Sequence, residues 1–107
     1  MKQLSPPELR EWLNDTTRAK PVLLDVREGW ETEYCRIDGS NWIPMREVSE
    51  RWDELNQEAE TVVICHHGVR SYHVAKFLEH QGFSDVYNLS GGVDGWARQV
   101  DPTMKTY

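Results

Sequence analysis

Short apolar runs alternate along this chain with longer segments whose apolar residues recur every three or four positions. The runs Val22–Val26 and Thr61–Ile64 carry few polar side chains, a pattern typical of strands buried on both faces of a parallel sheet. Two further strands are predicted at Asn41–Ile43 and Val86–Leu89. Parallel strands need crossover connections, which are right-handed. The alternation therefore predicts an α/β fold with a mostly parallel sheet.

Helix signals fill the segments between these strands. Ser5 and Glu8 form a capping-box pattern, and Gly82 suits a left-handed helix end. Helices are predicted from the Ser5 cap to about Asn14, from Glu28 to Tyr34, from Met45 to about Glu58, from Ser71 to about Gln81, and over a short segment around Trp96. The final residues, 101–107, are expected to be loosely held, as chain ends often are.

Length and charge narrow the classes of function. A chain of 107 residues with 38% hydrophobic residues fits one domain with one core. Its formal net charge of -6 provides no broad basic surface, so a nucleic-acid partner is not expected. The apolar runs are too short to cross a membrane, and the first residues lack the pattern of an export signal. These features predict a cytoplasmic protein with no membrane partner.

The chain has two cysteines, Cys35 and Cys65, which are too few for a disulfide scaffold and fit a reducing cytosol. A Cys35–Cys65 bridge remains an alternative. Cys35 has no activating neighbours, and we interpret it as a structural or incidental thiol, or as a thiol that resolves oxidised Cys65.

The turn that begins at Cys65 carries the clearest chemical signal. Cys65 follows the buried strand 61–64, and ligands of open α/β sheets bind beyond the carboxyl ends of such strands. Gly68 lets the backbone curl into a nest of inward N–H groups, and the next helix points its positive end at the same place. Both effects favour the nucleophilic thiolate of Cys65. Arg70 adds a guanidinium fork for an oxyanion.

Four motifs resemble those of the rhodanese family, in the order of that family. They are Leu24-Asp25-Val26-Arg27, Ile37-x-Gly39-Ser40-x-x-Ile43-Pro44, Cys65-x-x-Gly68-x-Arg70-Ser71 and Gly91-Gly92-x-x-x-Trp96. The third resembles the active-site loop of the family. One departure is that Cys35-Arg36 and Asp38 stand where the family usually has Gly-His and Pro. This change bears on local turn geometry or specificity more than on activity.

The resemblance implies one rhodanese-like domain over residues 1–107, with its core at about 4–100. The expected fold is an open, mostly parallel five-stranded sheet with helices on both faces. The implied activity is that of a thiosulfate sulfurtransferase. In this reaction Cys65 attacks the outer sulfur of thiosulfate or a similar anionic donor, and sulfite leaves. The Cys65 persulfide then gives its sulfur to cyanide, a thiol or a protein thiol.

The expected site residues divide into three groups. Cys65 is the catalytic nucleophile. The loop that binds substrate and persulfide consists of His66, His67, Gly68, Val69, Arg70 and Ser71. Asp25 and Arg27 are expected to support neighbouring loops through hydrogen bonds. No cofactor and no metal are expected, because adjacent residues such as Cys65, His66 and His67 rarely direct their side chains at one tetrahedral centre.

Two other functions remain open from sequence. Cys-dependent phosphatases and arsenate reductases also combine a nucleophilic Cys with an N–H nest and an Arg. Their related loops place five residues between Cys and Arg, whereas four separate Cys65 from Arg70 here. A binding module without catalysis, or a relay of persulfide between proteins, is the second alternative.

Overall fold

The computed structural model describes every residue from 1 to 107. Five strands form one sheet in the order β1-β5-β4-β2-β3, and every neighbouring pair is parallel. The strands are β1 (Lys2–Leu4), β2 (Val22–Asp25), β3 (Asn41–Trp42), β4 (Thr61–Ile64) and β5 (Val86–Leu89). The predicted five-stranded open α/β fold is confirmed.

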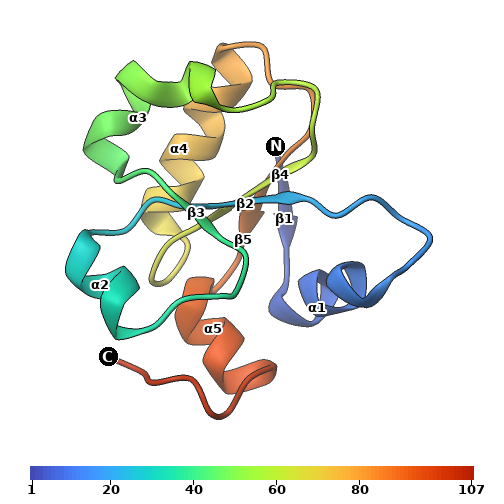
Figure 1. Cartoon of the computed structure of the whole chain (residues 1–107), viewed down its shortest axis with the longest axis vertical. Coiled ribbons are helices and arrows are strands. Elements are labelled where there is room, and N and C mark those ends of the chain that lie inside the picture. The colour runs from blue at the N-terminus through green and yellow to red at the C-terminus, as the bar shows by residue number, and fades with distance from the viewer.

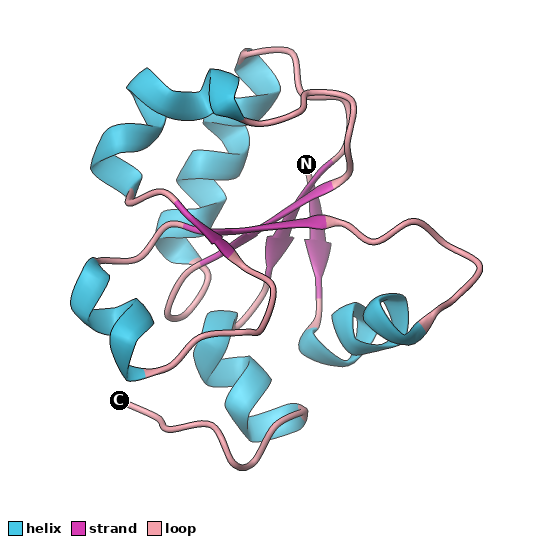
Figure 2. Ribbon diagram, in the orientation of Figure 1, coloured by secondary structure: helices cyan, strands magenta, loops and turns pink.

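Helices cover both faces of this sheet (Figures 1 and 2). They are α1 (Pro6–Asn14), α2 (Gly29–Tyr34), α3 (Met45–Arg51), the short 3₁₀ helix η1 (Trp52–Glu54), α4 (Val69–His80) and α5 (Gly92–Gln99). In Figure 1, α3 and α4 lie on one side of the strands and α1 and α5 on the other. None of these helices combines the length and apolar character needed to cross a membrane.

Two apolar cores follow from this layering, because successive side chains of a strand point to opposite faces. Leu24 and Val63 pack with α3 and α4, in a cluster that includes Val48, Val74 and Leu78. On the other face, strand residues join α1 and α5 in a second cluster, which includes Leu9, Trp12, Leu23, Val62, Val93 and Trp96. Burial on both faces explains why β2 and β4 read as continuous apolar runs.

Several local predictions are confirmed. The capping box at Ser5 is present, with the Glu8 N–H donating to Ser5 Oγ and the Ser5 N–H donating to the Glu8 carboxylate. Gly82 has a φ of +98°, which is the left-handed conformation expected after α4.

Three elements differ from the expectation. The strand β1 was not predicted, because it is three residues long and contains only one apolar side chain. The helix predicted to continue to about Glu58 ends at Arg51 and becomes the 3₁₀ turn η1, yet Trp52 and Leu55 still pack on the core beside α3 and α4. Helix α4 begins at Val69, two residues before the predicted Ser71.

The prediction of a loosely held C-terminal segment was wrong. The Tyr107 hydroxyl donates to Glu31 Oε2 at 2.6 Å and accepts from Arg27 Nη1 at 3.0 Å. Its ring packs edge-on against Trp30 and Tyr34, so the chain end lies beside α2 in Figure 1. Aromatic burial and these hydrogen bonds offset the entropy lost in ordering residues 101–107.

Asp25 and Arg27 form a fully buried ion pair at the end of β2, and further hydrogen bonds of Arg27 connect this pair to α2. The Arg27 side chain has no exposed area, and its Nη2 lies 2.7 Å from both Asp25 Oδ2 and the Cys35 carbonyl oxygen. Nη1 also donates to the Glu31 carbonyl. Burial alone would lower the pKa of Arg27, but hydrogen bonds to Asp25 and Tyr107 outweigh it and raise that pKa. The guanidinium therefore stays charged and ties three segments together.

Replacing one partner of this pair should be costly. Arg27→Met leaves the Asp25 carboxylate buried without its counter-charge, so we expect the free energy of unfolding to fall by about 3–5 kcal/mol in urea titrations. Arg46→Met is the matched control, because Arg46 pairs with Glu28 on the surface with 62% of its side chain exposed. The control should lose less than about 1 kcal/mol. Equal losses in the two variants would contradict the structural role given to Arg27.

Candidate active site

Cys65 follows the central strand β4 directly, and its side chain is buried. Its Sγ accepts a hydrogen bond from the Gly68 N–H at 3.0 Å and lies 3.2 Å from Ser71 Oγ. Gly68 has a φ of +103°, a backbone conformation that residues other than glycine rarely adopt. The loop therefore curls around the sulfur and directs an amide hydrogen at it.

The carbonyl groups of this loop are held on its outer side by the first turn of α5. The Val93 N–H donates to the Cys65 carbonyl at 2.9 Å, and the Asp94 N–H donates to the His66 carbonyl at 3.1 Å. This approach requires glycine at 92, where φ is +58° and an added Cβ would lie 2.4 Å from both carbonyl oxygens. Since N–H and C=O point in opposite directions across a peptide plane, outward carbonyls leave the following N–H groups facing inward.

Helix α4 adds its positive end to the same place. The helix begins at Val69, and Gly68 is its N-cap residue without a capping side chain. The N–H groups of the first turn have no partner within the helix, and the aligned peptide dipoles place partial positive charge there. An anionic sulfur on Cys65 is stabilised by this arrangement.

Arg70 lies in the first turn of α4 and binds the carboxylate of Glu31 with both of its terminal nitrogens. The Nη1–Oε1 and Nη2–Oε2 distances are 2.7 and 2.9 Å. Burial would raise the pKa of Glu31, but hydrogen bonds from Arg70 and Tyr107 outweigh it and lower the pKa to about 2. The same bonds to Glu31 raise the pKa of Arg70. The oxyanion fork expected at Arg70 is thus partly occupied by a carboxylate of the protein.

His66 lies between two aromatic rings. The Tyr107 ring stacks on it with centroids 3.8 Å apart and an interplanar angle of 5°, and His67 lies on it at 3.9 Å and 34°. Burial lowers the pKa of His66, and the neighbouring His67 contributes. Nε2 of His66 is buried without a hydrogen-bond partner. We therefore expect His66 to be neutral near pH 7, whereas His67 is largely exposed.

His66 and His67 form with Asp94 the one group of side chains whose donor atoms are placed for a metal ion, all within 4.8 Å of one another. A metal lies in the plane of each imidazole that binds it, whereas these two rings overlap, with centroids 3.9 Å apart and planes tilted by 34°. Asp94 also accepts from Arg98 at 3.0 Å. The three side chains are therefore neighbours without being a preformed metal site.

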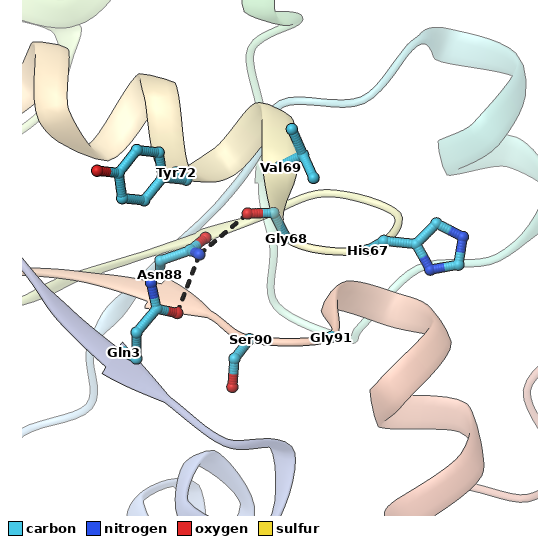
Figure 3. Close-up of a pocket in the computed structure, with 8 residues that line it drawn as sticks. All are labelled: Gln3, His67, Gly68, Val69, Tyr72, Asn88, Ser90 and Gly91. Atoms are coloured by element: carbon cyan, nitrogen blue, oxygen red, sulfur yellow. Dashed lines mark hydrogen bonds between the residues drawn. The ribbon is translucent and has the colours of Figure 1, made fainter.

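Besides the α5 residues that bind the loop carbonyls, Glu31, Asn88 and Tyr107 also contact the Cys65–Ser71 segment and were not predicted from sequence. Glu31 and Tyr107 lie far from Cys65 along the chain, and nothing in their local sequence indicates these contacts. Asn88 could have been noticed in the sequence, because it is a polar residue within the otherwise apolar strand β5. Its Nδ2 donates to the Gly68 carbonyl at 3.0 Å, as Figure 3 shows, and its Oδ1 accepts from Ser71 Oγ.

A shallow pocket of 280 Å³ lies beside the loop, on the side of Asn88 (Figure 3). His67, Gly68 and Val69 contribute to its lining, whereas Cys65 does not. Both cysteines are free, so the alternative of a Cys35–Cys65 bridge is not realised. Cys35 is partly buried, and its Sγ lies 3.8 Å from Arg27 Nη1.

Residues 5–99 match the family model described as Rhodanese-like domain. The chain is 39% identical over 106 residues to the probable adenylyltransferase/sulfurtransferase MoeZ of Mycobacterium tuberculosis, covering 97% of this chain and 26% of that protein. It is 35% identical over 113 residues to a chloroplastic rhodanese-like/PpiC domain-containing protein of Arabidopsis thaliana, covering 100% of this chain and 38% of the relative. The chain thus spans well under half the length of these two relatives.

Other relatives match over most of their length. Thiosulfate sulfurtransferase GlpE of Actinobacillus pleuropneumoniae is 36% identical over 86 residues, which cover 80% of each chain. Among solved structures, a rhodanese-like domain protein from Staphylococcus aureus superposes with a TM-score of 0.85 at 28% identity, covering 100% of this chain and 99% of that one.

The close approach at Gly92 can be tested by adding one methyl group. Gly92→Ala must displace two carbonyl groups of the loop and hold a left-handed conformation, so we expect a loss of about 3 kcal/mol in unfolding free energy and slower alkylation of Cys65. Gly39→Ala is the matched control, because Gly39 has a φ of +85° with nothing within 4 Å of the added Cβ. The control should lose only about 1–2 kcal/mol and alkylate normally. Normal alkylation of Cys65 in Gly92→Ala would rule out the proposed contact.

The Glu31 carboxylate should contribute to the acid dependence of stability. Its folded pKa of about 2 lies below the ordinary value of 4.5, so its contribution is present above pH 4.5 and lost as the pH falls through 2. Between pH 5 and 2 the wild-type protein should lose about 3 kcal/mol more unfolding free energy than Glu31→Gln. Glu54→Gln, at an exposed ion pair, should keep the wild-type slope. Parallel slopes for wild type and Glu31→Gln would refute this.

Proposed function

This chain belongs to the rhodanese-like family, and on that premise we propose that it is a thiosulfate sulfurtransferase that carries sulfur as a persulfide on Cys65. The observation that supports this most is the surroundings of Sγ. The sulfur receives the Gly68 N–H at 3.0 Å and lies at the amino end of α4. These groups stabilise a negative charge on sulfur, first as a thiolate and then as a persulfide anion.

The proposed transfer has two steps. In the first, the Cys65 thiolate attacks the outer sulfur of thiosulfate, a new S–S bond forms, and the S–S bond of the donor breaks. The electron pair of that bond leaves with sulfite, and the persulfide keeps one negative charge. In the second, cyanide or a thiolate attacks the terminal sulfur and releases the Cys65 thiolate. The two steps balance without a redox cofactor.

The rest of the loop has supporting roles in this proposal. Two N–H groups of Arg70 bind Glu31, and the other three have no protein acceptor, so they are free to bind an anionic donor. His66, His67 and Val69 belong to the segment that curls around the sulfur, and Ser71 provides a hydroxyl 3.2 Å from it. Asp25 and Arg27 support the site indirectly, because Arg27 holds α2, which carries Glu31, through hydrogen bonds.

The acceptor is proposed to be cyanide, a small thiol or a protein thiol, and the location a reducing cytoplasm, where free cysteines persist. A phosphatase is disfavoured because four residues separate Cys65 from Arg70 and because Glu31 occupies part of the guanidinium. A relay of persulfide between proteins uses the same chemistry with a protein as the acceptor.

Loading with sulfur is the test of this proposal. After reduction and incubation with thiosulfate, intact-protein mass spectrometry should show one added sulfur atom, which cyanide or a thiol removes. Cys65→Ala should show no adduct and no turnover, whereas Cys35→Ala should behave as wild type. Hydrolysis of a phosphotyrosine-type substrate, measured in parallel, should be absent. If reduced wild type takes up no sulfur, or if Cys65→Ala still does, the proposal fails.

A further inference from the structure

We propose that Asn88 is a positioning residue for the Cys65 sulfur, because it binds both residues that form a hydrogen bond with Sγ. Those residues are Gly68, whose N–H donates to Sγ, and Ser71, whose hydroxyl lies 3.2 Å from it. Asn88 binds the carbonyl of the first and the hydroxyl of the second. This inference rests on the proposed function for the identity of the reaction that Asn88 supports.

The orientation of the Asn88 carboxamide follows from its partners. A backbone carbonyl only accepts, so the atom 3.0 Å from the Gly68 oxygen must be the amide nitrogen. The same nitrogen donates to Gln3 Oε1 at 3.1 Å, which satisfies its second hydrogen (Figure 3). The amide oxygen therefore faces Ser71. Asn88 is buried at 3% exposure, and each polar atom of its side chain has a partner.

The single hydrogen of the Ser71 hydroxyl then connects Asn88 with the nucleophile. Oδ1 of Asn88 only accepts, so Ser71 donates to it while the Cys65 thiol donates to Ser71. When the sulfur carries a negative charge, it becomes a second acceptor for the same hydrogen. Rotation of the hydroxyl about its C–O bond then moves the hydrogen bond from Asn88 to the sulfur, while Ser71 stays in place.

Among the donors that bind the loop carbonyls from outside the loop, Asn88 differs from those of α5 in being a side chain. The Cys65 and His66 carbonyls are bound by backbone N–H groups of α5, which no substitution other than proline removes. The Gly68 carbonyl is held by a side chain, that of Asn88, from the neighbouring strand β5. Asn88 thus binds a third loop carbonyl, in addition to the two that α5 binds.

The test measures the nucleophile directly, without a sulfur donor. Asn88→Leu keeps the branching of the side chain at Cγ and removes all three hydrogen bonds, so the rate of Cys65 alkylation by iodoacetamide should fall about tenfold. Sulfur loading from thiosulfate should slow by a similar factor. Thr61→Val is the matched control. It also removes a side-chain hydrogen bond of a buried strand residue, that of the Thr61 hydroxyl to the Ala59 carbonyl, but at the far end of β4. The control should alkylate at the wild-type rate.

The direction of the change separates positioning from a loosened fold. Because Cys65 is buried, local unfolding would speed its alkylation, and Cys35 in the same sample would report that loosening. If Asn88→Leu does not fold, Asn88→Asp keeps the shape and places an oxygen against the Gly68 carbonyl, and the rate should again fall. A folded variant that alkylates Cys65 as fast as wild type, or faster, overturns the inference.

The outcome for Asn88 is independent of the outcome for sulfur transfer. If wild type takes no sulfur from thiosulfate but Asn88→Leu still alkylates tenfold more slowly, the proposed function fails and the positioning role stands. If wild type loads sulfur and Asn88→Leu loads and alkylates equally well, the proposed function stands and the positioning role fails.

Discussion

The site depends on one close approach of backbone to backbone, between the first turn of α5 and the loop that begins at Cys65. Two N–H groups of α5 bind two carbonyl groups of the loop, and the absence of a side chain at Gly92 makes that distance possible. Holding the carbonyls outward directs the following N–H groups inward. The loop thereby becomes a receptor for negative charge before any substrate is present, which is the property that a sulfur carrier requires.

A charged network fixes the same loop from the other side. Arg70 binds Glu31, Glu31 accepts from Tyr107, and Tyr107 accepts from Arg27, which is paired with the buried Asp25. Buried ion pairs add little net stability, because desolvation offsets much of their attraction, but breaking one leaves a charge unpaired. The value of this network is therefore geometric: it connects β2, α2, α4 and the last residue into one arrangement around the sulfur.

The parts of this structure that depend on local sequence patterns could be predicted from the sequence. Buried strands such as Thr61–Ile64 are visible as apolar runs, and Gly68 between Cys65 and Arg70 indicates a curled loop at a strand end. The ion pair between Arg70 and Glu31 was not predictable in the same way, since its members lie 39 positions apart along the chain and no local pattern connects them. Tyr107 was expected to be loosely held, as chain ends often are. Its partners Arg27, Glu31 and His66 come together only in the folded protein, so the sequence did not reveal them. Asn88 stood out as a polar residue in a buried strand, but its partners were visible only in three dimensions.

If inward N–H groups stabilise the negative charge of a sulfur carried on Cys65, loading with sulfur should change the chemical shifts of those amide protons. The shifts can be compared between the reduced and the sulfur-loaded protein in ¹H–¹⁵N correlation spectra. On loading, the Gly68 amide proton should move downfield, with smaller shifts at the start of α4, while the distant Gly39 amide should not move. Sulfur carried on Cys65 with no change at Gly68 would contradict this role of the N–H groups.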